Sequence, residues 1–323
     1  MINLAICGYG AWGRKLVQAV QGQSPVARFG VIVTRDPGAL ADAASQIGAD
    51  AVGTLEQALS RGDVQGVVLA TPHSLHADQV VQCAAASVPV FVEKPFALHL
   101  SEAARALDAF PPGMVVAAGF NRRFLPSVAA LKQAILTGRL GDILCAEGNF
   151  SGNVVGLYRA GQWRASHAES PLGGLAGAGI HVIDLLIHLV GDVRRVAGQS
   201  SRRALDIDMD DTTTLLFELD GGAQASLVTV MASAPDFRLK LFGTNGSAEL
   251  LGAQRIIWTP LDGAPEVQDF PDFNIERAEI DAFATAITGG AAFPVSRAEI
   301  LNGVAAFEAA ATAVQQRRWV DLP

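Results

Sequence analysis

Short apolar runs separated by amphipathic or alanine-rich segments dominate the first 118 residues of the chain. Each run is continuously rather than alternately apolar, which predicts strands that are covered on both faces. Alternation of such strands with helices predicts a parallel sheet wound by right-handed crossovers. The runs are 2–7, 29–33, a weaker one at 51–52, 67–70, 90–92 and 114–118, and the helix-like segments lie near 12–22, 38–47, 54–61, 75–87 and 101–110.

The pattern changes after Gly119. Turn signals at Asp220-Gly221-Gly222 and Asn245-Gly246 separate segments of β character that have no helix between them. Consecutive hairpins predict a largely antiparallel, open sheet, so the second half is expected to be α+β. The β-like segments are 211–219, 223–232, 236–243, 247–251 and 255–259, and the helix-like ones are 127–136, about 180–190, 276–288 and 297–317.

Two domains follow from these two patterns. We predict a doubly wound α/β domain over residues 1–120 and an α+β domain over residues 121–323. Whether the C-terminal helices pack back on the first domain is left open by the sequence.

Composition and charge exclude several classes of protein. The chain has 323 residues, and its formal net charge of −8 lacks the basic excess that a nucleic-acid-binding protein needs. The cysteines, Cys7, Cys83 and Cys145, are too far apart for a disulfide framework or a metal knuckle, and the histidines show no metal-ligand spacing, so we predict no metal. Neither a secretory signal nor a membrane-spanning apolar stretch is present, so we expect a cytoplasmic protein.

A glycine-rich turn follows the first predicted strand and opens the first predicted helix. It consists of Gly8, Tyr9, Gly10, Ala11, Trp12 and Gly13. The first glycine permits a tight turn, the second lets the backbone approach a pyrophosphate, and the third lets helix and strand pack closely. The alternative is an ordinary structural turn. We favour a dinucleotide site because the turn lies between a strand and a helix and further such units follow.

The end of the second predicted strand bears on which dinucleotide is bound. NAD enzymes place an acidic residue there to accept from the ribose hydroxyl, but this chain has Thr34 followed by Arg35. Thr34 would not repel a 2′-phosphate, and Arg35 could pair with one. The alternative is that Arg35 is solvated and Asp36 serves the ribose. We favour NADP over NAD.

Two predicted loops leave the carboxyl ends of the fourth and fifth strands, where a nicotinamide lies in doubly wound sheets. One contains Thr71, Pro72 and His76, and the other is Glu93-Lys94-Pro95. A lysine shielded from water beside a cationic nicotinamide would lose proton affinity and could exchange the proton of a substrate hydroxyl. The alternative for Lys94 is an ordinary surface lysine.

The chain resembles the Gfo/Idh/MocA oxidoreductases, named for glucose–fructose oxidoreductase and inositol dehydrogenase. The similar segments fall in the family's order along nearly the whole chain. They are residues 8–13, 70–72 with His76, 93–95, 119–123, 138–141, 163–164, 173–174, 179–185, 210–212, 242–246 and 279–283.

This resemblance implies a Rossmann domain followed by a domain with a largely antiparallel sheet, and a small substrate such as a sugar or cyclitol. It implies that Lys94 contacts cofactor and substrate and that His181 donates or accepts a proton. It places Trp163 and Arg164 near the cofactor, although packing and a salt bridge are the alternatives. It further implies a homodimer or homotetramer formed through the open sheet.

Additional contacts are expected around this site. Asn121 and Arg122 start the second domain and are candidates for substrate binding. The position at which the family commonly has an aspartate, four residues before the histidine, is Gly177. His181 would then act with Lys94 alone, with Tyr158 or His167, or not at all. Asp184, three residues after His181 on one helical face, could partly substitute for that acid, but the family has an aspartate at this place too, which favours a structural role.

Two hypotheses follow. The first is an NADP-preferring oxidoreductase that transfers a hydride between the nicotinamide and a hydroxyl or carbonyl carbon of a sugar, cyclitol or similar molecule, or of a less polar carbonyl compound, since a glycine leaves a roomier and less acidic pocket. The second is a non-catalytic nucleotide sensor on the same fold, which the loss of the acid at Gly177 keeps open.

Overall fold

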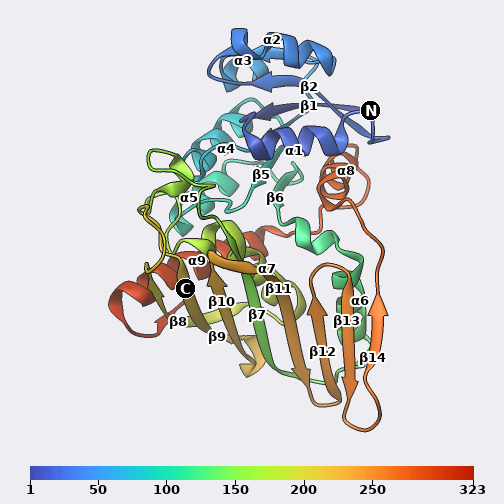
Figure 1. The fold of residues 1–323 in the computed structure, drawn as a ribbon. Coiled ribbons are helices and arrows are strands. Elements are labelled where there is room, and N and C mark those ends of the chain that lie inside the picture. The colour runs from blue at the N-terminus through green and yellow to red at the C-terminus, as the bar shows by residue number, and fades with distance from the viewer. The chain divides into compact units, whose positions relative to one another are not determined.

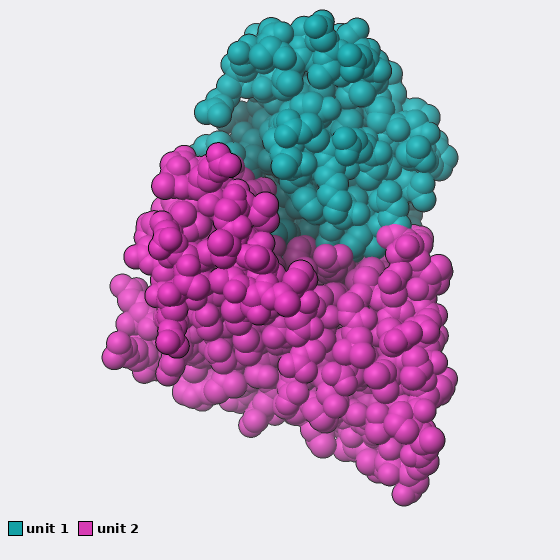
Figure 2. Space-filling view, viewed as in Figure 1, with its two compact units in different colours: residues 1–121, 274–300 teal, residues 122–273, 301–323 magenta.

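The computed structural model describes residues 1–323, and the chain divides into two compact units (Figure 2). The first unit comprises residues 1–121 and 274–300, and the second comprises residues 122–273 and 301–323. The two units are therefore interleaved in sequence. None of the helices combines the length and apolarity that crossing a membrane requires.

The first unit is built on a parallel sheet of six strands in the order β3-β2-β1-β4-β5-β6 (Figure 1). Its central strands are buried along their whole length, as continuous apolar runs require. The predicted doubly wound fold is confirmed. The strands are β1 (Ile2–Cys7), β2 (Ala27–Val33), β3 (Asp50–Val52), β4 (Gly66–Leu69), β5 (Val90–Glu93) and β6 (Val116–Gly119).

Six helices accompany this sheet, close to the segments predicted for them. Five connect or follow its strands, and the sixth comes from the C-terminal part of the chain and packs beside α1. They are α1 (Ala11–Val20), α2 (Pro37–Gln46), α3 (Leu55–Leu59), α4 (His76–Ala85), α5 (Leu100–Asp108) and α8 (Ile275–Ile287).

Helix α8 is part of the core of the first unit. Phe283 contacts Phe91 of β5 with ring centroids 5.9 Å apart. A β-carbon added to Gly66 would lie 2.9 Å from Ile287 and 3.2 Å from Phe283, so the bare strand surface lets the helix approach. The ion pair between Lys15 and Glu276, at 2.6 Å, links α8 to α1.

The second unit is built on a nine-stranded sheet in the order β14-β13-β12-β11-β7-β10-β9-β8-β15. Only β7 and β10 pair in parallel, and every other neighbouring pair is antiparallel, which confirms the predicted largely antiparallel sheet. The strands are β7 (Ile143–Asn153), β8 (Val193–Ser201), β9 (Thr212–Leu219), β10 (Gln224–Val230), β11 (Ala232–Gly243), β12 (Gly246–Leu251), β13 (Arg255–Pro260), β14 (Glu266–Asp269) and β15 (Val320–Asp321).

The sequence pattern did not predict β7, which is the central strand of this sheet, nor β8, β14 and β15. Strand β7 contains Gly148 and Gly152 together with polar residues, and this composition gives a weak strand signal. Pairing with β10 and β11 on either side imposes the extended conformation. A β-carbon on Gly148 would lie 2.3 Å from Val182, so this glycine instead serves close packing of a helix on the strand.

Helices cover one face of the sheet of the second unit (Figure 1). Side chains on that face, such as Leu215, Leu227 and Leu239, are buried, whereas their neighbours along each strand are wholly or partly exposed. The opposite face is therefore open. The helices are α6 (Pro126–Leu136), α7 (Ile180–Leu189), which follows a π-helical turn (Leu175–Gly179), and α9 (Arg297–Gln316).

Candidate functional site

The glycine-rich turn between β1 and α1 is shaped by two close backbone approaches. Gly8 has a φ of +97°, and a β-carbon there would lie 2.5 Å from the carbonyl oxygen of Ala70. A β-carbon on Gly13 would lie 2.0 Å from the carbonyl oxygen of Gly8. Only glycine fits both positions, because the conformation of the first and the packing of both exclude a side chain. Gly8 thus allows the tight turn, and Gly13 allows helix α1 to pack closely against it.

The middle glycine of the turn has a different environment. A β-carbon on Gly10 would meet no atom within 4 Å. Gly10 is also the N-cap of α1, with no side-chain cap and no acidic residue in the first turn. The first N–H groups of the helix thus have no side-chain cap, which is the arrangement that binds an anion. The residues present fit the pyrophosphate of a dinucleotide.

At the end of β2 the structure separates the roles of three neighbouring residues. The carboxylate of Asp36 accepts a hydrogen bond from the backbone N–H of Ala39 at 3.0 Å and caps α2. Thr34 is half-buried, and its backbone N–H donates to Val52. Arg35 is exposed. Asp36 is exposed as well, and one oxygen of its carboxylate is engaged in the cap.

The loops after β4 and β5 are tied together by one buried imidazole. The ring nitrogens of His76 lie 2.9 Å from the carbonyl oxygen of Pro95 and 3.1 Å from that of Thr71. The Lys94–Pro95 peptide bond is cis. Lys94 is half-buried at the carboxyl end of β5, next to the buried Glu93. His76 thus fixes the loop that carries the lysine, a role that the sequence did not reveal.

In the second unit, two aromatic rings support both a cation and an imidazole. Phe150 of β7 and Phe237 of β11 are directly opposite one another, with ring centroids 4.8 Å apart. The guanidinium of Arg122 lies 5.4 Å from each ring centroid, a cation–π distance. The His181 ring, near the start of α7, lies 5.9 Å from Phe150. This aromatic pair was missed by the sequence analysis, because β7 itself was missed.

A buried ion pair beside this group explains Asp184. Its carboxylate accepts from the guanidinium of Arg123, with the shortest contact at 2.7 Å, and both side chains are almost fully buried. The same guanidinium lies 3.3 Å from a ring nitrogen of His188. Asp184 therefore binds α7 to the segment that precedes α6. This supports the structural role inferred for it.

The segment from Gly173 to Gly179, which includes the π-helical turn before His181, contains glycines of two kinds. A β-carbon on Gly173 would lie 1.8 Å from the carbonyl oxygen of Asp210, and β-carbons on Gly174 and Gly179 would press on Met231 and Thr229. A β-carbon on Gly177 would meet nothing within 4 Å, and Gly177 is exposed. Packing requires glycine at the first three positions and leaves the fourth open.

Comparison with known proteins assigns the family. Residues 2–116 match the oxidoreductase family with an NAD-binding Rossmann fold, and residues 128–249 match the GFO/IDH/MocA C-terminal domain. The chain belongs to the Gfo/Idh/MocA oxidoreductases. The resemblance noted in the sequence is confirmed.

Curated relatives are similar to this chain in sequence, and a solved structure shares its fold. Inositol 2-dehydrogenase 2 of Saccharopolyspora erythraea is 28% identical over 310 residues, covering 90% of this chain and 86% of the relative. Trans-1,2-dihydrobenzene-1,2-diol dehydrogenase of Bos taurus is 26% identical over 66% of this chain, and the match spans only 61% of that relative. The structure of levoglucosan dehydrogenase with NADH and L-sorbose superimposes with a TM-score of 0.91 at 22% identity, covering 100% of this chain and 99% of that one.

The remaining predicted residues have surroundings of their own. Asn121 belongs to the first unit, where its amide lies 3.5 Å from Glu276. The Arg164 guanidinium stacks on the Trp163 ring at 4.2 Å. Tyr158 is half-buried against an apolar cluster, and His167 is exposed.

Other parts of the chain carry little chemistry. Burial raises the pKa of the Cys7 thiol to about 12, and the hydrogen bond from Gln79 opposes this shift only in part. Burial also raises the pKa of the Cys83 thiol. Neither thiol is therefore a nucleophile. No group of three or more His, Cys, Asp or Glu side chains is arranged to hold a metal ion.

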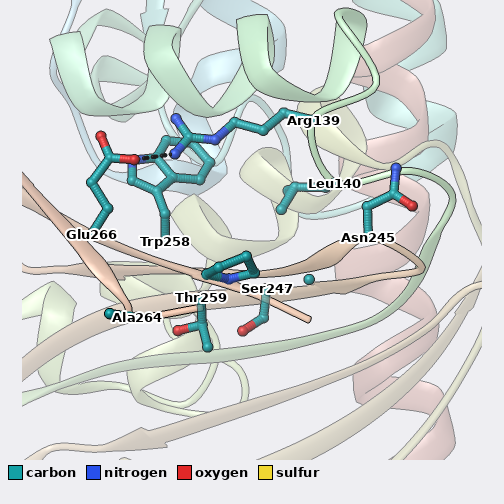
Figure 3. A pocket seen from close by; sticks show the side chains of 10 residues that line it. Arg139, Leu140, Asn245, Ser247, Trp258, Thr259, Ala264 and Glu266 are labelled. Atoms are coloured by element: carbon teal, nitrogen blue, oxygen red, sulfur yellow. Dashed lines mark hydrogen bonds and ion pairs between the residues drawn. The ribbon is translucent and has the colours of Figure 1, made fainter. Parts of the chain in front are cut away.

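A pocket of about 180 Å³ lies elsewhere in the second unit (Figure 3). Arg139 stacks on Trp258 at 4.0 Å and pairs with Glu266 at 2.6 Å at its rim. None of the residues predicted for catalysis or cofactor binding lines it.

Proposed function

We propose that this protein is an NADP-preferring oxidoreductase that transfers a hydride between the nicotinamide and a hydroxyl or carbonyl carbon of a small molecule. The observation that carries the proposal is the open space at Gly10, where helix α1 begins without a side-chain cap. The half-buried Lys94 follows a strand of the same parallel sheet. When bound, the nicotinamide supplies or accepts the hydride. The protein supplies orientation and proton transfer.

Lys94 and His181 are the residues proposed to act on the substrate oxygen. The ammonium of Lys94 binds that oxygen and exchanges its proton, and the closed loop around His76 holds the lysine in place. His181 is the second proton donor or acceptor. Phe150 orients its ring, and Asp184 is engaged by Arg123, which leaves the acid/base work to these two groups.

The glycine turn and its flanks are proposed to bind the dinucleotide. Tyr9, Ala11 and Trp12 complete the turn around the pyrophosphate, and Thr71, Pro72 and Glu93 line the loops at the end of the sheet. Trp163 and Arg164 are proposed to contribute from the second unit. For the adenosine half we propose Thr34 and Arg35 as the 2′-phosphate site, since the guanidinium of Arg35 is exposed and one oxygen of Asp36 caps α2.

The substrate class rests on the relatives' names. One relative is an inositol dehydrogenase, another is a dihydrobenzenediol dehydrogenase, and a protein of the same fold is a levoglucosan dehydrogenase. All three names point to a ring carrying hydroxyl groups, so a sugar, cyclitol or related diol is proposed, with Asn121, Arg122 and Tyr158 as further contacts. A cytoplasmic homodimer or homotetramer formed through the open sheet face is proposed as the working form.

Replacement of Lys94 tests the proposed chemistry. Lys94→Ala is expected to lower kcat/KM about 100-fold or more with any alcohol or ketone that the wild type turns over, because a positioned acid/base contributes that much. Lys94→Arg is the matched control, since it keeps the charge but does not release a proton. NADPH binding, followed by fluorescence titration, should persist in both variants. Full activity in Lys94→Ala would refute the assigned role.

A panel of polyols, sugars and ketones separates the enzyme from the sensor. Absorbance of the reduced cofactor should change with at least one member of the panel. Tight NADPH binding with no turnover across the panel would identify a nucleotide sensor instead.

The nucleotide preference has its own test. Arg35→Ala is expected to weaken NADP binding about tenfold, equivalent to one lost charge-assisted contact, and to leave NAD binding unchanged. Equal titration curves for the two nucleotides with the wild type would defeat the NADP assignment.

A further inference from the structure

Arg14 lies in the first turn of helix α1, next to the glycine-rich turn of residues 8–13. Its Nη1 donates a long hydrogen bond, at 3.4 Å, to the carbonyl oxygen of Tyr9. Tyr9 stands in the middle of the turn, between Gly8 and Gly10. Side chains of a helix lean toward its N-terminus, which lets residue 14 reach residue 9. The guanidinium of Arg14 is therefore held at the glycine-rich turn itself.

The positive charge of Arg14 is not neutralised within the chain. Arg14 is exposed and forms no ion pair, whereas the next residue, Lys15, pairs with Glu276 at 2.6 Å. The first turn of α1 also contains no acidic residue. A guanidinium has several N–H donors, and the carbonyl of Tyr9 accepts from one of them. The other donors and the charge are available to an anionic ligand.

The backbone at the same place suits a phosphate group. Helix α1 begins without a side-chain cap, and a β-carbon on Gly10 would meet nothing within 4 Å. Residues 2–116 match a family with an NAD-binding Rossmann fold, in which the pyrophosphate lies against the glycine turn and the helix N-terminus. Arg35 follows β2 instead, at the place where such folds bind the adenosine ribose. Arg14 and Arg35 therefore lie beside different parts of a dinucleotide.

A cation at the turn also offsets the charge of the whole chain. The formal net charge is −8, so the overall field opposes the approach of a ligand that carries phosphate groups. A guanidinium forms strong, charge-assisted hydrogen bonds with phosphate oxygens and matches their geometry with two parallel N–H groups. The local attraction at Arg14 thus acts against the general repulsion.

From these observations we propose that Arg14 is a further cofactor-binding residue, whose guanidinium pairs with the pyrophosphate of the bound dinucleotide. This inference rests on the proposed function. The carbonyl of Tyr9 orients the guanidinium before the nucleotide binds, so less side-chain freedom is lost on binding. Because NAD and NADP share the pyrophosphate, Arg14 strengthens the binding of both, whereas Arg35 discriminates between them.

The variant Arg14→Gln tests this role, because glutamine lacks the charge but keeps an N–H donor for the carbonyl of Tyr9. It is expected to weaken the binding of NADPH and of NADH alike, by about tenfold, as the loss of one charge-assisted contact would. Fluorescence titration measures both affinities. The loss should shrink at high ionic strength, since salt screens an exposed charge. Unchanged affinity for both nucleotides would overturn the inference. A loss confined to NADPH would also overturn it, by placing the guanidinium at the 2′-phosphate.

Two further variants serve as controls. Arg28 is exposed near the amino end of β2, so it lies at the sheet edge opposite the glycine turn. Arg28→Gln removes the same charge and is expected to leave both affinities unchanged; an equal loss there would reduce the effect to net charge and overturn the inference. Arg14→Lys keeps the charge and is expected to recover part of the lost affinity. Binding as weak as that of Arg14→Gln would contradict a charge-based contact.

The outcomes separate this inference from the proposed function. A wild type that binds neither NADPH nor NADH would refute the dinucleotide site and the inference together. A wild type that binds both nucleotides and turns over a substrate, with Arg14→Gln unchanged in affinity, would refute only the role of Arg14. Thermal unfolding without nucleotide should be the same for Arg14→Gln and the wild type, since the side chain is exposed.

Discussion

The two glycine-rich turns of this protein, one in each unit, use glycine for the same two purposes. In the turn at residues 8–13, Gly8 and Gly13 are pressed against backbone carbonyls, and Gly10 faces open space. In the turn around residues 173–179, Gly173 is pressed against a backbone carbonyl, and Gly177 faces open space. Each turn thus combines glycines that the fold requires with one that it does not require.

The two open glycines differ in what surrounds them. Gly10 lies at the uncapped N-terminus of α1, where N–H dipoles attract an anion. Gly177 is exposed, and only its neighbour Ala178 belongs to a buried apolar cluster. The first environment suits a phosphate, whereas nothing around the second selects a ligand. A sequence motif reports where glycines occur, but only the neighbouring atoms distinguish a packing glycine from one that leaves room for a ligand.

The largest effects on stability are expected at the glycines that lie against a backbone carbonyl. Gly13→Ala and Gly173→Ala should each lower the free energy of unfolding by about 3 kcal/mol or more, because the new β-carbon overlaps a carbonyl oxygen that cannot move independently. Thermal unfolding followed by circular dichroism measures the loss. If either variant is as stable as the wild type, the backbone of that turn can shift to make room for the methyl group. Packing would then not require glycine at that position.

An intermediate effect is expected at Asp211, next to the carbonyl that Gly173 approaches. Burial alone would raise the pKa of this carboxyl, but the backbone N–H groups of Ala204, Arg203 and Leu205 and the hydroxyl of Thr212 hold it below its ordinary value. A group whose pKa is lower in the folded state stabilises the fold above its unfolded pKa, near 3.8, and stops doing so as the pH falls through its folded pKa.

The variant Asp211→Asn tests this pH dependence. It should cost about 2–3 kcal/mol at pH 7, where the carboxylate accepts charge-assisted hydrogen bonds, and clearly less near pH 3. Urea unfolding at both pH values measures the difference between variant and wild type. The turn of the first unit has no such carboxylate, so Gly8→Ala should destabilise to the same extent at both pH values. An Asp211→Asn penalty that does not change with pH would contradict the electrostatic account.

The smallest effects on stability are expected at the two open glycines. Gly10→Ala and Gly177→Ala should change the free energy of unfolding by about 0.5 kcal/mol or less, because the added methyl group meets no atom. Their functions should nevertheless separate. Gly10→Ala is expected to weaken NADPH binding about tenfold by keeping the pyrophosphate from the backbone, and Gly177→Ala to leave it unchanged. Fluorescence titration of NADPH measures binding by both variants. An equal loss of NADPH affinity in the two variants would contradict the different roles given to Gly10 and Gly177.

Much of the first unit could be predicted because its signals are local. Strand β1 is apolar along its length, and Gly8, Gly10 and Gly13 follow at the spacing that a strand–turn–helix unit needs. The role of His76 could not be predicted from the same sequence. Its ring bridges Thr71 and Pro95, and that contact exists only once β4 and β5 pair side by side.

The second unit was less predictable because its central strand is specified by its neighbours. Glycines and polar residues weaken the signal of β7, so Phe150 was not recognised as a residue of the site. Asp184 illustrates the same limit. Its position one turn after His181 left a catalytic role open, and the contact with Arg123, far away in the sequence, reveals what the carboxylate binds.

By itself the sequence determined the class of fold, the family, and the positions of the glycine turn, Lys94 and His181, since hydrophobic period and short motifs depend on residues near one another along the chain. The tertiary structure decided which glycines the packing requires and which are open, that Asp36 caps a helix, and that the Phe150 ring lies against His181. Those properties depend on atoms brought together from distant segments, and no local pattern encodes the distance between them.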